Sequence, residues 1–267
     1  MSATAPPSFD TIIVAVDGAT GSLTLSQPER LNPLSSHTLH EIESAARWFD
    51  GHDELKVVVV SGQGRAFSAG ADVSAFGDRA DGPVSPRDDA DSGWRMARAM
   101  DEMRAVTVAR IQGWCVGGGL VLAAGCDLRV AASTARFSIP EVELGIPLAW
   151  GGIPRLVREI GPAATKELVM TCRAFSAEEA QRLGLVNRVV AAEDLDREVQ
   201  ELAGALAAKA TFPVRATKRH VDAVTAAMVG TARSWNDADA LLTALRDPEC
   251  RAAGARYLDA LGRRRGD

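Results

Sequence analysis

Stretches of apolar and polar residues alternate along the chain and predict strands and helices in turn. Short apolar runs rich in β-branched residues predict strands at residues 11–16, 22–25, 56–61, 106–111 and 126–131. The first two strands form a hairpin, and an apolar face over residues 39–49 predicts a helix that leads into strand 56–61. The repeated alternation of strand and helix favours an α/β fold.

The last third of the chain has the pattern of helices alone. One apolar face is formed by residues spaced four, three and four apart, Leu195, Val199, Leu202 and Leu206. We therefore divide the chain into a flexible tail (1–9), an α/β core (10–193) and a helical C-terminal subdomain (194–267). The remaining apolar faces of the C-terminal subdomain suit contacts between subunits.

An acidic stretch at residues 77–93 interrupts the pattern. It contains two prolines and almost no large apolar side chain. We expect it to be mobile and the next helix to span Trp94–Met103.

Composition adds few constraints. The chain has 267 residues with 46% hydrophobic content, enough for one large core, and its net charge of −5 gives no reason to expect nucleic acid as a partner. Its longest apolar run, Trp114–Cys126, is too short for a membrane span. The cysteines lack C-x-x-C spacing and the N-terminus lacks a signal-peptide pattern, so we expect a cytoplasmic protein with reduced thiols. No histidine has ligand spacing, so we expect no metal.

The candidate chemistry lies in Ile111–Gly145. Strand 106–111 is followed by Gly117, Gly118 and Gly119, and an apolar helix begins at about Leu120. Such a turn lets backbone N–H groups at a helix N-terminus approach a ligand and stabilise negative charge. A second loop of small residues, AFSAGAD (Ala66–Asp72), follows strand 56–61 and has the same capacity.

These motifs together resemble the enoyl-CoA hydratase/isomerase family of the crotonase superfamily. The resemblance rests on AFSAGAD and on GWCVGGG, LVLAAGCD and FSIPEVELG within Gly113–Gly145, and it covers roughly residues 10 to 260. It implies a crotonase-like core with a helical C-terminal subdomain, assembled as a homotrimer or a dimer of trimers. It also implies an acyl-CoA thioester substrate, with coenzyme A as part of the substrate, no separate cofactor and no membrane partner.

The resemblance also implies roles for individual residues. The backbone N–H groups of Ser68 and Gly118 would polarise the thioester carbonyl, and Glu141 would transfer protons. The residues expected to bind the acyl or CoA part are Arg30, Ala66, Ala71, Asp72, Val73, Gly117 and Val121. Trp150 is close in sequence to Glu141, so we expect it either to narrow the acyl pocket or to be an ordinary core residue.

One position departs from the pattern of the family's hydratases. They commonly use two glutamates, and where the first should stand this chain has Val121, which can neither donate nor accept a proton. One carboxylate is enough to move a proton between two carbons, as the Δ3-Δ2 enoyl-CoA isomerases of the family do, so we favour an isomerase using Glu141. Glu143 is a weaker rival with the same chemistry.

Other interpretations stay open. A non-catalytic acyl-CoA-binding protein is consistent with Val121, and a hydratase with a substituted second acid is a further alternative. A serine hydrolase is disfavoured because Ser68 lies in A-x-S-x-G, and a dinucleotide-binding enzyme because Phe67 stands where a third glycine should fall.

Overall fold

The computed structural model of the chain describes residues 7–72, 85–230 and 236–266. Most of the predicted flexible tail lies outside these ranges, but Phe9 packs, partly buried, against the core. None of the described helices is long and apolar enough to cross a membrane.

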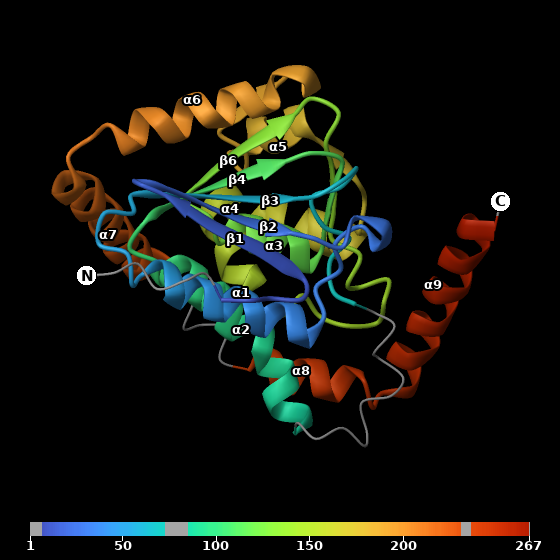
Figure 1. Cartoon of the computed structure of the whole chain (residues 1–267). Coiled ribbons are helices and arrows are strands. Elements are labelled where there is room, and N and C mark those ends of the chain that lie inside the picture. The colour runs from blue at the N-terminus through green and yellow to red at the C-terminus, as the bar shows by residue number, and fades with distance from the viewer. Residues whose placement is uncertain (1–6, 73–84, 231–235, 267) are drawn as a thin grey trace.

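A six-stranded mixed sheet forms the centre of the molecule (Figure 1). Its strands, in spatial order, are β1 (Ile12–Asp17), β2 (Thr20–Leu25), β3 (Val57–Gly62), β4 (Val106–Ile111), β6 (Leu128–Ala132) and β9 (Arg188–Val190). The hairpin β1–β2 is antiparallel and all other pairs are parallel. The predicted hairpin, the three buried strands and the α/β fold are therefore confirmed, whereas β9 was not predicted.

Both faces of this sheet are buried, as expected for parallel strands with continuous apolar runs. Val57, Val108 and Val130 on one face pack against the apolar side of α6 (Leu195–Ala207). The opposite face packs against α1 (Ser36–Phe49) and α2 (Pro86–Glu102), as Figure 1 shows. The predicted apolar face of α6 is thus confirmed, and this helix packs on the core sheet although it lies beyond residue 193. The division into subdomains stays a prediction.

A smaller sheet supports the glycine turn. Its strands are β5 (Trp114–Val116), β7 (Arg136–Ser138) and β8 (Phe175–Ser176). The polypeptide passes from β5 through Gly117, the N-cap with φ of +48°, directly into α3 (Gly118–Ala124). Two of the three glycines therefore belong to the helix and not to a separate turn.

Helix α2 corrects the expectation for residues 85–93 of the acidic stretch, whereas residues 77–84 lie outside the described part of the chain. Within the described residues the helix begins at Pro86, eight residues before the predicted start. The Ser85 hydroxyl accepts a hydrogen bond from the Asp88 N–H, Pro86 occupies the first turn, and Asp88 and Asp89 place negative charge there. These features stabilise a helix N-terminus. The acidic residues are thus a start signal, and their low hydrophobicity alone was a misleading guide.

The rest of the described chain is mainly helical. The remaining elements are η1 (Pro28–Arg30), α4 (Gly152–Thr171), α5 (Ala177–Leu183), η3 (Ala192–Asp194), α7 (Thr211–Met228), α8 (Asp237–Ala244) and α9 (Pro248–Gly266). As predicted, the described residues beyond 194 contain no strand. Helix α8 packs against α2 through Ala90, Ala238 and Leu241, while α9 projects away from the sheet (Figure 1).

Candidate active site

The glycine triplet seats two side chains that lie far from it in sequence. A Cβ atom built on Gly117 would lie 2.3 Å from Oε1 of Glu141, and one built on Gly118 would lie 2.2 Å from the Trp150 ring. Side chains do not pack at such distances, so both positions require glycine in this arrangement. The triplet therefore brings Glu141 and Trp150, two predicted site residues, to the N-terminus of α3.

Glu141 has the environment of a proton-transfer group. The residue is 8% exposed, and within the described part of the protein its Oε2 atom has no hydrogen-bond partner. Burial raises the pKa of its carboxyl group to about 7 from an ordinary value of 4.5, because the charged form loses hydration. A base with a pKa near neutrality can both take and return a proton at physiological pH.

The structure corrects the role predicted for Ser68. Its backbone N–H donates to the carbonyl oxygen of Trp114 at 3.1 Å, so it is not free to polarise a substrate. Its hydroxyl donates to the Asn32 carbonyl at 2.7 Å and accepts from the Gly70 N–H at 3.1 Å. The residue is 0% exposed. Ser68 therefore shapes the loop and does not contact the pocket.

Ala71 offers the N–H group that Ser68 lacks. It borders the same pocket as Gly118 and Glu141, and its N–H has no acceptor among the described residues. Gly118 is the first residue of α3, where N–H groups have no intrahelical acceptor. The two loops touch, because a Cβ on Gly70 would lie 3.4 Å from the Gly118 nitrogen. Two residues whose backbone N–H groups have no acceptor among the described residues thus line one pocket, which suits stabilisation of a developing oxyanion.

The pocket encloses about 530 Å³ of empty space, including its opening to solvent. Val121, 1% exposed, lines it beside Glu141, and Trp150 contributes its wall. The structure thus brings together Glu141, Gly118, Val121, Ala71 and Trp150 from the predicted set.

Other predicted binding residues lie elsewhere or outside the described chain. Ala66 is 1% exposed and its carbonyl accepts a hydrogen bond from Asn32, so we correct its assignment to a structural one. Arg30, with an exposed guanidinium group, pairs with the Asp72 carboxylate at 2.8 Å at the end of the AFSAGAD loop. Val73 lies outside the described residues. The predicted contact of Arg30 and Asp72 with CoA stays a prediction.

Several pocket residues were missed by the sequence analysis. Ser36 of α1 and Asp89 and Ser92 of α2 form a polar patch, in which the Ser36 hydroxyl donates to the Asp89 carboxylate and the Ser92 hydroxyl to the Asp89 carbonyl. Leu241 reaches the pocket from α8. The Ser85-Pro86 helix start was the sequence signal that could have placed Asp89 on a helix. Leu241 carries no such signal.

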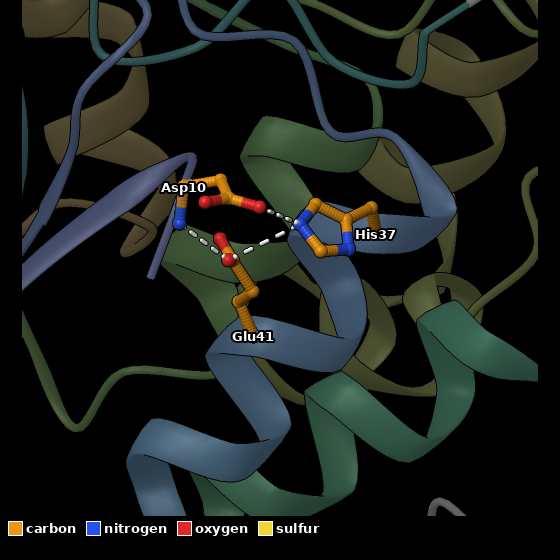
Figure 2. A group of neighbouring side chains, drawn as sticks. All are labelled: Asp10, His37 and Glu41. Carbon is orange, nitrogen blue, oxygen red and sulfur yellow. Dashed lines mark hydrogen bonds and ion pairs between the residues drawn. The ribbon is translucent and has the colours of Figure 1, made fainter. Parts of the chain in front are cut away.

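Two further groups of residues lie apart from the pocket. Glu143 is exposed, so the rival to Glu141 does not reach the substrate space. Among the described residues, Asp10, His37 and Glu41 are close enough to hold a metal ion (Figure 2). The Glu41 carboxylate already accepts hydrogen bonds from the backbone N–H groups of Asp10 and Thr11, at 2.6 and 2.9 Å. These contacts show that the group links α1 to the segment just before β1.

Comparison with known proteins agrees with this geometry. Residues 17–258 match the model of the enoyl-CoA hydratase/isomerase family. The chain is 35% identical to crotonyl-CoA hydratase of Syntrophomonas wolfei, over 79% of this chain and 80% of that protein. It is 32% identical to short-chain-enoyl-CoA hydratase of Clostridium acetobutylicum, over 80% and 82% of the two chains.

A solved structure shares the fold over almost the whole chain. An enoyl-CoA hydratase/isomerase from Mycobacterium paratuberculosis superposes with a TM-score of 0.85, at 26% identity, and covers 93% of this chain and 99% of its own. The expected crotonase-like fold is therefore confirmed. With its glycine turn, its buried glutamate and these relatives, the chain belongs to the enoyl-CoA hydratase/isomerase family.

Proposed function

We propose that the protein is a Δ3-Δ2 enoyl-CoA isomerase that moves a proton with Glu141. The observation that carries the proposal is the pairing of a buried carboxylate at position 141 with an aliphatic side chain at position 121 of the same pocket. Hydration needs one group to activate water and another to deliver a proton to carbon. Isomerisation needs a single base, which Glu141 supplies.

The reaction follows from the placement of the donors. The N–H groups of Ala71 and Gly118 bind the thioester carbonyl and stabilise the negative charge that develops on its oxygen. The Glu141 carboxylate removes a proton from C2 of a 3-enoyl-CoA, and the C–H electrons become part of a dienolate. Glu141 then returns the proton to C4, and the double bond moves from C3–C4 to C2–C3. No atom is gained or lost overall.

The test is conversion of 3-enoyl-CoA to the conjugated 2-enoyl-CoA. Glutamine has nearly the volume of glutamate but cannot accept the proton, so Glu141→Gln should lower kcat about 10²- to 10⁴-fold. Acyl-CoA affinity, measured by calorimetry, should change only severalfold. Glu143→Gln is the matched control and should leave turnover intact. Tight binding of acyl-CoA without turnover would instead indicate a binding protein.

Hydration is the second candidate, because the relatives named above are hydratases and because Asp89 lines the pocket. Asp89 would then replace the acid absent at Val121. Crotonyl-CoA hydration that is fast in the wild type and about 10²-fold slower in Asp89→Asn would favour this candidate. Asp88→Asn, which alters an exposed neighbour on the same helix turn, is the control.

We also propose that the protein assembles as a homotrimer or a dimer of trimers. Support comes from α7, which exposes four large apolar residues, namely Phe212, Val221, Val224 and Met228, the last three of them on one face of the helix at spacings of three and four residues. Exposed apolar patches are typical of protein interfaces. Light scattering should give a trimeric or hexameric mass, and Val221→Asp with Val224→Asp should reduce it. A wild-type monomer at micromolar concentration would contradict the assembly.

A further inference from the structure

We infer that the Trp150 indole is the wall that limits the acyl pocket to short chains, and that Gly93 and Asp237 hold this wall in place. The inference rests on the proposed function, because it assigns the acyl end of the same pocket. Trp150 is thus a specificity-determining residue, and Gly93 and Asp237 are positioning residues. None of the three is needed for the proton transfer itself.

The indole fills a slot between two helices. A Cβ built on Gly93 of α2 would lie 2.1 Å from Cδ2 of Trp150, and one built on Gly118 of α3 would lie 2.2 Å from Cζ3. Both helices therefore approach the ring at backbone distance. Any larger residue at position 93 must displace the ring, because a contact under 3.0 Å cannot persist.

The backbone under the ring is held in an uncommon conformation. Trp150 has φ of +61°, a left-handed conformation that bulky residues rarely adopt and that persists only where the surroundings impose it. The buried Arg155 of α4 donates to the carbonyls of Trp150 at 3.2 Å and Gly151 at 3.0 Å. The Gly151 N–H donates to the Asp237 carboxylate of α8 at 2.8 Å. Contacts from α4 and α8 thus hold the backbone at Trp150 and Gly151.

This position decides what the pocket accepts. The indole lies directly against Gly118, one of the two donors that would bind the thioester carbonyl. An acyl chain bound there must begin beside the ring. Because each methylene that a rigid pocket fails to admit changes selectivity by about 10-fold or more, a fixed indole selects short chains.

The experiment compares chain length across variants. In 3-enoyl-CoA substrates of four to ten carbons, Trp150→Ala should raise kcat/KM of the ten-carbon relative to the four-carbon substrate by about 10-fold or more. Trp150→Phe should give a ten-carbon to four-carbon ratio of kcat/KM between those of the wild type and Trp150→Ala. An unchanged chain-length profile in both variants would overturn the inference.

Gly93→Ala tests the seat of the ring. It should lower kcat/KM for the four-carbon substrate about 10-fold in the wild type and have little effect in the Trp150→Ala background, since the clash is then gone. Gly204→Ala is the control, because no atom lies within 4 Å of a Cβ at that position. An equal effect of Gly93→Ala in both backgrounds would contradict the claim that Gly93 positions the Trp150 indole.

Calorimetry of saturated acyl-CoAs separates this inference from the proposed function. If Trp150→Ala changes how affinity depends on acyl chain length and the wild type shows no isomerase turnover, Trp150 limits chain length but the protein is not an isomerase. If the wild type turns over and Trp150→Ala leaves the affinity and kcat/KM profiles unchanged, the protein is an isomerase but Trp150 does not limit chain length.

Discussion

The two ends of the pocket are built in different ways. At the proton-transfer end that we propose, burial raises the pKa of a single carboxylate, and backbone N–H groups would stabilise the negative charge on the substrate. At the acyl end that we infer, selectivity would depend on steric fit between Trp150 and the surfaces of α2 and α3. The first end should respond to changes in charge and pH, whereas the second should respond to changes in volume and leave the chemistry intact.

Among changes that keep the Glu141 carboxylate, the largest effect should follow from Gly117→Ala, which disturbs the proton-transfer end. The new Cβ would collide with the Glu141 carboxylate, and the φ of +48° would be strained for alanine. We expect kcat to fall about 10²-fold or more, because a misplaced base loses its reach to the substrate. Gly204→Ala is the control in a steady-state assay. A Gly117→Ala enzyme with normal kcat would contradict the claim that Gly117 positions the Glu141 carboxylate.

The second-largest effect should be a pH dependence of kcat/KM that arises at the proton-transfer end alone. Glu141 must be deprotonated to act as a base, so the rate should fall about 10-fold per pH unit below its pKa of about 7. The profile should have the same midpoint for short and long substrates and in Trp150→Ala. A midpoint that moves with acyl chain length would show that the two ends are coupled.

A smaller effect is expected on stability. The folded state raises the pKa of Glu141 from 4.5 to about 7, so between these values it binds more protons than the unfolded state. The free energy of unfolding therefore falls as pH rises through this window, by about 3 kcal/mol in total. Glu141→Gln should recover this loss at pH 9 and change little at pH 5.

Thermal unfolding at the two pH values measures this difference. We expect an increase in Tm of several degrees for Glu141→Gln at pH 9 only. Glu143 is exposed, so the change in Tm caused by Glu143→Gln should not depend on pH. An equal change in Tm at both pH values would mean that burial of charge does not raise the pKa of Glu141.

The smallest effect should come from Asp237→Ala at the acyl end. Loss of its hydrogen bond to Gly151 should destabilise the protein by about 1 kcal/mol and reduce chain-length discrimination a few fold, because the Trp150 turn loses one of its holds. The kcat for the four-carbon substrate should stay within twofold. Asp239→Ala, an exposed acid on the same helix, is the control for both measurements.

The sequence by itself determined the layers of the fold and indicated the carboxylate that we propose as the base. Val106–Ile111 forms a strand and Leu195–Ala207 a helix because hydrophobic periodicity is a local property that burial rewards directly. The glycine triplet and Glu141 could be found for a similar reason, since each stands in a short motif of fixed order.

Only the tertiary structure decided which groups border the pocket. The N–H of Ser68 bonds to Trp114 and that of Ala71 does not, and the hydrogen-bond partner of a loop N–H depends on a strand more than forty residues away. The seat of Trp150 in the same way needs Gly93, Arg155 and Asp237, which are brought together by packing of α2, α4 and α8. Such pairings depend on the path of the whole chain, because no local pattern encodes which distant surfaces will meet.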